Sequence, residues 1–531
     1  MFFVLGSGPA SVSCAVALAQ RGIPVTILDA GRTLEPERAA RVARMGAQEA
    51  AQWSEADLHA IRAGDKSARE GSVHVKLTYG SDYPYSEPGH TLREPGVPID
   101  FHYSRARGGL SNVWGASLLP NRASDIRDWP LSLEELEPHY RAVHRFLPSS
   151  SVRDELDARL PIYTERGEAW ESSRQIAGFL ADLKKHRARL ERGGLYYGRS
   201  RMAVRVGGDA HRHACNYCGL CLYGCPYTLI YSSAQTLDDL LAAGKVTYVP
   251  DQIVERLEQT PGGTVRIHTR SRLDSQPGVY EASRVFAGCG ILPTAYIVLN
   301  SLGHYNTPHP MLDSQYFIYP FFRFGKTQGV ESEALHSLAQ AFLEIDAPWV
   351  SERLVHLEVF SYSDFLRQAL METPLRWLLR HGRLREELLG RLLVLQGFLH
   401  SDDSARMEVE LIRESAQARP VLAVRPRKNA HSLWTSLKAG LKLSSHALSL
   451  RGLPVIPAIQ FADPGRSYHS GGSFPMRREP GALECDTLGR LPGWDRVHLI
   501  DASVFPSIPA TSITLTVMAN AHRIGTEAPE G

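Results

Sequence analysis

The stretch "FFVLGSGPASVSCAVALAQRGIPVTILDAG" (residues 2–31) decides the fold class. The apolar run Phe2–Leu5 predicts a buried strand, residues 10–20 predict a helix, and Val25–Leu28 predicts a second strand. A strand, a tight glycine turn, a helix and a second strand form the first unit of a Rossmann-like parallel sheet. We therefore expect an α/β protein whose first domain is Rossmann-like.

The turn in this stretch has the residues of a dinucleotide-binding site. Gly6 and Gly8 let the backbone turn sharply and approach a pyrophosphate, which the N-terminus of the next helix attracts. Ser11 is small enough for close packing of helix on strand, and Asp29 can accept hydrogen bonds from ribose hydroxyls. An ordinary βαβ turn is the alternative. The motif alone does not separate FAD from NAD.

Composition and charge are ordinary for a globular protein of two or more domains. The chain has 531 residues, 43% of them apolar and 22% charged. Its 59 basic and 57 acidic residues leave a net charge of +2, which gives no argument for a nucleic-acid partner. The chain has no run of eighteen apolar residues, so we expect no membrane-spanning helix. The opening residues lack the basic region of a signal peptide. We therefore expect a cytoplasmic protein.

One segment leaves peripheral contact with a membrane open. Leu366–Leu399 is rich in Leu and Arg at helical spacing, and such a helix can lie on an anionic membrane surface. The alternative is a pair of amphipathic surface helices broken at Pro374.

The segment "HACNYCGLCLYGCPYT" (residues 213–228) holds four of the seven cysteines of the chain. Its spacing, C-x2-C-x2-C-x3-C-P, is that of bacterial ferredoxins, in which closely spaced thiolates bind an iron–sulfur cluster. The predicted ligands are Cys215, Cys218, Cys221 and Cys225. Cys289 and Cys485 are the remote candidates if Cys225 does not complete the cluster. Zinc is the main rival, although structural zinc sites usually use two cysteine pairs separated by a longer loop.

The C-terminal part carries a family resemblance. The segments "SYHSGGSFPM" (residues 467–476) and "DTLGRLPGWDRVHLIDASVFPSIPATSITLTVMANAHRIG" (residues 486–525) resemble the C-terminal signature of the glucose–methanol–choline (GMC) oxidoreductases. Two further stretches agree with that family in chain order: "GGLSNVWGA", followed by "DWPLSLEELEPHY", and "VFAGCGILPTAYIVLNS". Together with the N-terminal fingerprint they extend from end to end of the chain.

The resemblance implies that the dinucleotide is FAD, bound by residues from several parts of the chain. Gly6, Gly8, Ser11 and Asp29 would hold its ADP half, and Val254 would meet the adenine. The remaining implied contacts are Gly108, Gly109, Ser111 and Asn112 along the pyrophosphate and flavin, and Asp501 and Ala502 near the ribityl and phosphate groups.

The resemblance also implies the catalytic residues. His469 falls at the catalytic histidine of the family, and a histidine near neutral pH can take the proton of a CH–OH group while the flavin takes the hydride. The family usually has a second His or an Asn about forty residues later, where this chain has Ser512. A serine can hydrogen-bond a substrate hydroxyl but cannot act as a second base. No residue clearly predicts a covalent link to the flavin.

A cluster beside a flavin favours a dehydrogenase over an oxidase, because an oxidase needs no electron relay. Some relatives, the membrane-linked sugar dehydrogenases, have a three-iron cluster with spacing like that of Cys215, Cys221 and Cys225. The additional Cys218 favours a 4Fe-4S cluster over a 3Fe-4S cluster. The expected substrate is a sugar, polyol or other hydroxyl compound, and the expected acceptor is a quinone, a cytochrome or a ferredoxin. A redox-neutral or reductive biosynthetic flavoenzyme, or a flavoprotein with a purely structural zinc or cysteine loop, are the alternatives.

The expected domain organisation follows from the order of these motifs. Residues 1–309 form a FAD-binding domain with the cysteine insert at 205–230. Residues 310–458 form an α+β substrate-binding domain with an antiparallel sheet. Residues 459–531 complete the discontinuous FAD-binding domain.

Overall fold

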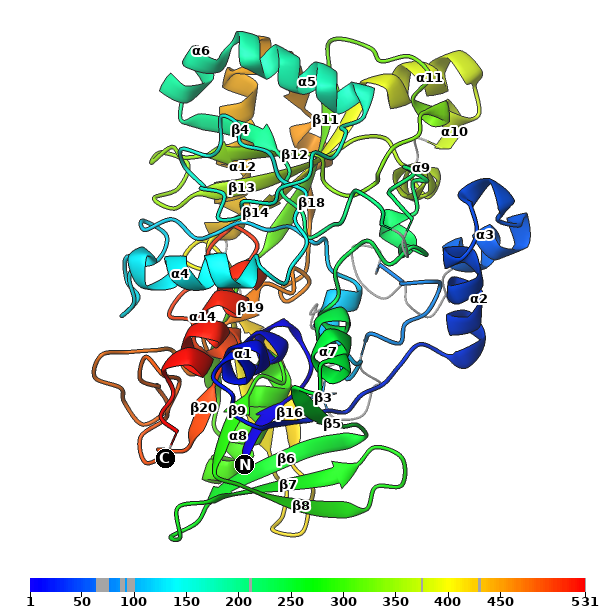
Figure 1. The fold of residues 1–531 in the computed structure, drawn as a ribbon. Coiled ribbons are helices and arrows are strands. Elements are labelled where there is room, and N and C mark those ends of the chain that lie inside the picture. Colours follow the sequence, from blue (N-terminus) through cyan, green and yellow to red (C-terminus); the bar gives the residue numbers. More distant parts are fainter. Residues whose placement is uncertain are drawn as a thin grey trace.

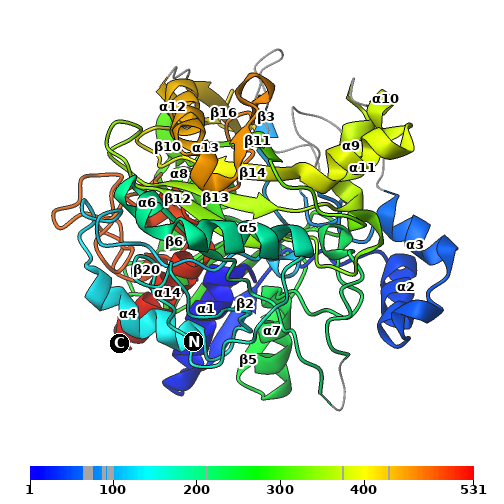
Figure 2. The same cartoon turned by 90° about the horizontal axis from the view of Figure 1, so that it is seen from above.

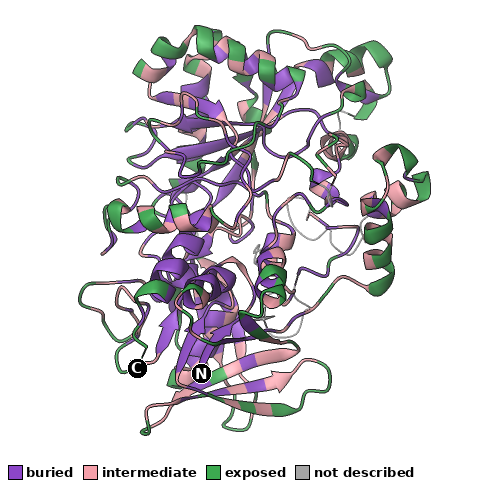
Figure 3. Cartoon of the chain, in the orientation of Figure 1, coloured by how far each residue is buried: buried purple, intermediate pink, exposed green. Residues whose placement is uncertain are grey.

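The structure is a computed structural model that describes residues 1–63, 76–85, 91–92, 101–209, 213–373, 376–427 and 431–530. A parallel sheet with its helices occupies one end of the molecule, and a larger antiparallel sheet occupies the other end (Figure 1). The antiparallel end is seen from above in Figure 2. Buried residues fill both sheets and the helices between them, whereas exposed residues follow the outer sides of the peripheral helices (Figure 3).

Five parallel strands form the sheet that the N-terminal stretch predicts. The strand order is β20-β9-β1-β2-β5, so the first strand is central and the last strand of the chain forms one edge. The strands are β1 (Phe2–Leu5), β2 (Val25–Leu28), β5 (Val246–Val249), β9 (Arg284–Ala287) and β20 (Val497–Leu499). The prediction of a discontinuous Rossmann-like fold is confirmed.

Two helices from opposite ends of the chain cover one face of this sheet. Helix α1 (Pro9–Gln20) packs along α14 (Thr514–Glu527), and both are almost entirely buried. A Cβ atom at Gly525 would lie 2.9 Å from the carbonyl oxygen of Cys14, so a glycine is required for this close helix contact. The first and last helices of the chain therefore pack as one unit.

Seven antiparallel strands form the second large sheet. Its order is β17-β11-β14-β13-β12-β4, with β18 paired to β11. The strands are β4 (Leu195–Arg199), β11 (Tyr316–Arg323), β12 (Ala341–Ile345), β13 (Val355–Phe360), β14 (Leu392–Phe398), β17 (Gly452–Pro454) and β18 (Gln460–Phe461). One face is apolar and packs against α5 (Arg174–Lys185), α12 (His431–Ser445) and α13 (Ala447–Leu450).

Two smaller sheets and further helices complete the fold. The first sheet has the strand order β19-β10-β15-β16-β3 and connects the two ends of the molecule. The second sheet has the order β6-β7-β8, and its strands come between β5 and β9 in the chain. Their strands are β3 (Thr91–Leu92), β6 (Gln252–Gln259), β7 (Val265–Ser271), β8 (Pro277–Ala282), β10 (His309–Asp313), β15 (Arg406–Ile412), β16 (Val421–Arg427) and β19 (Ser470–Gly471). The other helices are α2 (Pro36–Gly46), α3 (Glu55–Arg62), α4 (Leu133–Val143), α6 (Arg187–Arg192), α7 (Ser233–Ala242), α8 (Ile291–Leu302), α9 (Asp364–Met371), α10 (Arg376–Leu379) and α11 (Gly382–Arg391).

The expected helix pair at Leu366–Leu399 is partly wrong. Helices α9, α10 and α11 occupy its first part, but residues 392–398 form strand β14 between β11 and β13. Side chains along β14 alternate between the two faces of the sheet, as in a strand, because Leu393 and Leu395 both face the apolar core under the helices. Pro374 lies outside the described residues. No helix among the residues that the structure describes is long and apolar enough to cross a bilayer.

Candidate active site

A cavity lies at the carboxyl ends of the parallel strands, and Gly6, Asp29 and Val254 line it together. Gly6 has φ +86°, and a Cβ there would lie 3.0 Å from the carbonyl oxygen of Gly288, so the turn admits only glycine. The Ser11 hydroxyl lies within hydrogen-bonding distance of two carbonyl oxygens, that of Leu5 at 2.9 Å and that of Gly288 at 3.0 Å. Ser11 thus ties the turn that is expected to hold the cofactor to the sheet.

The Asp29 carboxylate lies at the end of β2 and already has two partners. It accepts hydrogen bonds from the Ser7 hydroxyl at 2.5 Å and from the Tyr248 hydroxyl at 2.9 Å. Burial raises the pKa of Asp29 to about 6, although both hydroxyls oppose the shift. A carboxylate that lines this cavity at the end of β2 is placed to accept a hydrogen bond from a ribose hydroxyl.

The segment Gly108–Asn112 lies directly over the glycine turn. Gly108 has φ +91°, and its N–H donates to the Ser7 hydroxyl at 2.9 Å. A Cβ at Gly109 would lie 3.3 Å from the Gly8 Cα, so the two glycine backbones are in contact. The Ser111 hydroxyl donates to the Gly108 carbonyl, and the Asn112 amide donates to the Gly109 carbonyl at 2.7 Å. Both side chains hold the shape of the loop, which leaves backbone groups to face a cofactor.

Asp501 joins the C-terminal segment to the start of α8. Its carboxylate accepts hydrogen bonds from the Gly290 N–H at 3.0 Å and the Thr294 hydroxyl at 2.6 Å, and burial raises its pKa. The next residue, Ala502, accepts a hydrogen bond from the Gly472 N–H at 3.0 Å. This contact connects the predicted cofactor segment to the turn that carries the predicted base.

His469 stands in that turn, immediately before β19. Its carbonyl accepts from the Ser314 N–H at 2.9 Å, and its N–H donates to the Ser467 hydroxyl at 3.0 Å. The imidazole stacks on the Phe398 ring, with centroids 4.9 Å apart and planes 26° apart. The buried Nδ1 has no hydrogen-bond partner among the described residues. Burial, together with the charge of nearby His356, lowers the pKa of His469 to about 4, so the ring is neutral at neutral pH.

Ser512 does not bond to His469. Its buried hydroxyl donates to the backbone carbonyl of Ser117 at 2.8 Å. The adjacent Thr511 hydroxyl is also turned away, toward the Asn121 amide oxygen at 3.5 Å. In this conformation the donor capacity of Ser512 serves the fold.

The sheet contributes polar residues that do not stand out in the sequence. His356 on β13 is fully buried and bonds through Nδ1 to the Glu344 carboxylate on β12 at 2.7 Å. Burial alone would lower the pKa of His356, but Glu344 and Glu358 outweigh it and raise it. Their only signal in the sequence is the one polar position in the strand run "AFLEI" and the two in "VHLEVF", which are also expected of ordinary strand alternation.

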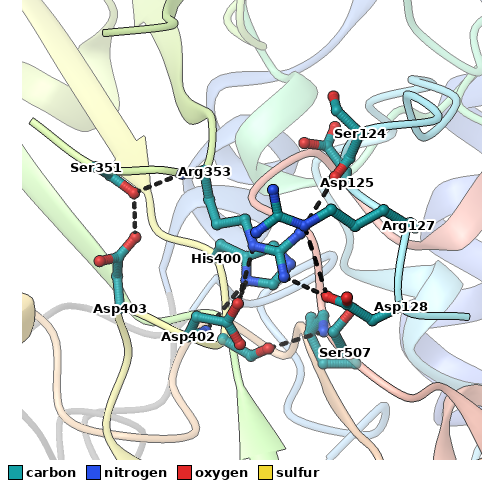
Figure 4. Close-up of polar contacts among 12 residues, drawn as sticks. Ser124, Asp125, Arg127, Asp128, Ser351, Arg353, His400, Asp402, Asp403 and Ser507 are labelled. Atoms are coloured by element: carbon teal, nitrogen blue, oxygen red, sulfur yellow. Dashed lines mark hydrogen bonds and ion pairs between the residues drawn. The ribbon is translucent and has the colours of Figure 1, made fainter. Parts of the chain in front are cut away.

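An ion-pair cluster holds the loops beside the sheet together (Figure 4). The Arg353 guanidinium, only 7% exposed, bonds to the carboxylates of Asp128 and Asp402 and donates to the Ser124 carbonyl at 3.1 Å. His400 lies 3.4 Å from the same Asp402 carboxylate. Because His400 follows Phe398 by two residues, this cluster fixes the strand end that supports His469.

The cysteine segment forms a loop with one short 3-10 turn at Cys221–Tyr223. Burial, together with the charge of neighbouring cysteine thiolates, raises the pKa of Cys218 and of Cys225 to about 12. Among the described residues, no group of three or more His, Cys, Asp or Glu side chains is arranged to hold a metal ion. Metal binding by this loop would therefore require its thiols to turn toward a common centre.

The two remote cysteines lie elsewhere. Cys289 lines the nucleotide cavity, and the Cys485 thiol donates to the Phe474 carbonyl at 3.0 Å. Neither thiol contributes to the electrostatic coupling among the clustered cysteines.

Residues 76–79 connect the cysteine loop to the glycine-rich segment. The Thr78 hydroxyl donates to the Asn112 carbonyl at 2.8 Å, and the Tyr79 hydroxyl donates to the Cys225 carbonyl at 2.9 Å. Lys76 donates to the Trp114 carbonyl at 2.9 Å. The loop thus lies one residue layer away from the segment expected to line the flavin.

Comparison with known proteins identifies the C-terminal part. A family model described as GMC oxidoreductase matches residues 404–521. This part of the chain is a GMC oxidoreductase domain. The matched residues include His469, Asp501 and Ser512, and the protein is an FAD-dependent oxidoreductase.

Solved structures share the fold over the whole length of the chain. Pyridoxine 4-oxidase from Mesorbium loti is 13% identical with a TM-score of 0.61, covering 99% of this chain and 98% of that one. A formate oxidase is 12% identical with a TM-score of 0.60, covering 99% and 97%. A variant of Aspergillus oryzae RIB40 formate oxidase is 12% identical with a TM-score of 0.57 and the same coverage. At these identities the likeness shows a common fold. No curated protein matches the chain in sequence.

Proposed function

We propose that the protein oxidises a CH–OH group of a sugar, polyol or other hydroxyl compound, with His469 as the base. The observation that carries this proposal is the state of the His469 ring. It is held over Phe398 by a hydrogen-bonded turn, it is neutral above pH 4, and its Nδ1 has no partner among the described residues. A neutral imidazole fixed in this way can accept a proton.

The cavity residues fit FAD as the cofactor. Only glycine fits at Gly6, the Gly8 and Gly109 backbones meet, and Asp29 offers a carboxylate to the cavity that it lines. Bound FAD supplies a hydride acceptor at N5. The chain's own task is to orient the alcohol carbon and to take the hydroxyl proton on a ring nitrogen of His469. The residues proposed to hold FAD are Gly6, Gly8, Ser11, Asp29, Gly108, Gly109, Ser111, Asn112, Val254, Asp501 and Ala502.

The His469→Ala variant tests the base. We expect it to bind FAD normally but to slow anaerobic flavin reduction by a substrate roughly 10²- to 10⁴-fold, the usual contribution of a general base. His144→Ala is the matched control, because burial also lowers the pKa of His144 to about 4 and its Nδ1 also has no partner in the described chain. Equal reduction rates in the wild type and the His469 variant would exclude this base.

We further propose that the cysteine loop binds an iron–sulfur cluster, with four irons, that relays electrons to a quinone, cytochrome or ferredoxin. Two observations support it: the thiols of Cys218, Cys221 and Cys225 couple electrostatically, and residues 76–79 bridge the loop to the flavin-facing segment. Such a cluster supplies one-electron steps. The loop residues would bind the cluster through their thiolates and hold it beside the cofactor domain.

Anaerobic metal analysis with an absorption spectrum tests the relay. We expect the wild type to contain iron. Cys221→Ser should lose the iron, whereas the control Cys485→Ser should retain it. Zinc without iron, or no metal at all, would leave the loop a structural element and remove the relay. If substrate reduces the flavin and then the cluster, electrons flow outward. A flavin reduced only by an external donor would favour the reductive alternative.

A further inference from the structure

The face of the antiparallel sheet opposite its helices carries a short polar row. In the strand register, Glu344 on β12 pairs with His356 on β13, and His356 pairs with Phe398 on β14. Their neighbours along the strands, Leu343 and Leu357, point the other way into the apolar core. Three adjacent strands therefore present a carboxylate, an imidazole and a phenyl ring side by side.

Only one of the two ring nitrogens of His356 has a hydrogen-bond partner among the described residues. Nδ1 is held by the Glu344 carboxylate at 2.7 Å, whereas Nε2 is buried without a hydrogen-bond partner in the described part of the chain. The side chain is 0% exposed, and it packs between the rings of Phe342 and Phe398. A buried polar nitrogen without a partner costs roughly 1–3 kcal/mol, so its retention suggests a ligand.

The same phenyl ring supports the proposed base. The centroid of the Phe398 ring lies 6.1 Å from that of the His356 ring and 4.9 Å from that of the His469 ring. The corresponding interplanar angles are 24° and 26°. Two imidazoles, each with a buried nitrogen that lacks a partner, thus contact one ring. Ser512, at the position where the family has its second polar residue, bonds instead to the Ser117 carbonyl.

We propose that His356 is the second catalytic residue of this site, donating from Nε2 to the substrate oxygen, with Glu344 as its positioning residue. On this inference, which rests on the proposed function, the hydroxyl proton passes to His469 and the C–H electron pair leaves as hydride to the cofactor. The C=O bond forms as the O–H and C–H bonds break. Negative charge that develops on the oxygen is stabilised by the Nε2–H of His356. The substrate sheet therefore supplies a group that the C-terminal segment lacks.

Charges around the pair agree with these roles. The charges of two carboxylates act on His356, Glu344 from β12 and Glu358 from its own strand, while Arg122 and Arg201 interact electrostatically with Glu344. His469 feels the charge of His356. The environments shift the pKa values of the two histidines in opposite directions, as is typical of paired acid and base groups.

The first test measures how His356 affects the pKa of His469, and it needs no substrate. The FAD-loaded enzyme is prepared with 13C-labelled histidine, the His469 signal is assigned with His469→Gln, and its pKa is followed by NMR. We expect His356→Gln to raise the pKa of His469 toward its ordinary value by about half a unit or more, as removal of a nearby positive charge should. Glu344→Gln should act in the same direction. His336→Gln, at another buried histidine of which Nδ1 lacks a partner in the described chain, should have no effect.

The second test measures anaerobic flavin reduction by the substrate. We expect His356→Gln to slow the reduction at saturating substrate about 10²-fold, the usual effect of losing one such donor, with FAD content and melting temperature close to those of the wild type. Glu344→Gln should show a smaller loss. An unchanged His469 pKa would overturn the proposal, and so would a shifted pKa with wild-type reduction. If no hydroxyl compound reduces the wild-type flavin, the proposed function fails, while the NMR result still decides whether the two histidines face each other.

Discussion

Asp29 allows a quantitative test of the cofactor site. Its pKa is raised to about 6 by burial, and a ribose hydroxyl requires the ionised carboxylate as its acceptor. Between pH 7 and pH 5 the ionised fraction falls from about nine-tenths to about one-tenth. The affinity of the apoprotein for FAD should therefore be highest above pH 6 and fall about tenfold by pH 5, which corresponds to about 1.4 kcal/mol.

Asp29→Asn should remove this pH dependence. The amide keeps the shape of the side chain but has no charge, and a hydrogen bond to a charged group contributes roughly 1.5–3 kcal/mol. We expect the Kd for FAD at pH 7 to rise roughly 10- to 150-fold and to stay flat between pH 5 and pH 7. Asp274→Asn, in the exposed turn between β7 and β8, is the control. The assay is quenching of FAD fluorescence on binding to the apoprotein. A flat wild-type profile, or a slope retained in Asp29→Asn, would refute the reasoning.

Two further predictions concern the loops around the site. Arg353→Met should lower the free energy of unfolding by about 2–3 kcal/mol, measured by urea denaturation. The variant loses the hydrogen bonds of a buried guanidinium, but the two half-exposed carboxylates that paired with it regain water. Arg127→Met, at an exposed arginine, should change it by less than about 0.5 kcal/mol, and a similar loss in both variants would contradict the buried-cluster explanation. Gly108→Ala should abolish FAD binding, measured as flavin absorbance per chain, because φ is +91° and the new Cβ would lie 2.8 Å from the Ser232 hydroxyl. Gly115→Ala, with open space around its Cα, should retain FAD, and equal flavin content in both variants would argue against the close approach.

Local signals in the sequence were sufficient for the nucleotide half of the fold. Residues 2–31 form a strand, a turn, a helix and a strand in direct succession, so the apolar pattern and the glycine spacing within this one segment predict them. Residues 392–398 were different, since the leucine-rich run before them has helical spacing and only pairing with β11 and β13 makes them a strand. Tertiary pairing of this kind overrides local propensity.

The site shows the same division between local and long-range information. His469 could be found because a short C-terminal signature surrounds it. His356 and Glu344 could not, because their contact depends on the register between β12 and β13, and each alone is consistent with ordinary alternation in a mostly apolar strand. The conformation of the Ser512 hydroxyl likewise depends on Ser117, which lies 395 residues away in the chain.

The packing of α1 on α14, and of β20 beside β9, has a consequence for biosynthesis. A ribosome adds about 5–20 residues per second, so on the order of 25–100 s separate the emergence of β1 from that of the last helix. During this time the face of α1 that packs on α14 stays uncovered, because α14 has not yet been made. The nascent chain therefore holds an unfinished nucleotide fold through nearly all of translation, and cofactor loading becomes a step that follows release of the complete polypeptide.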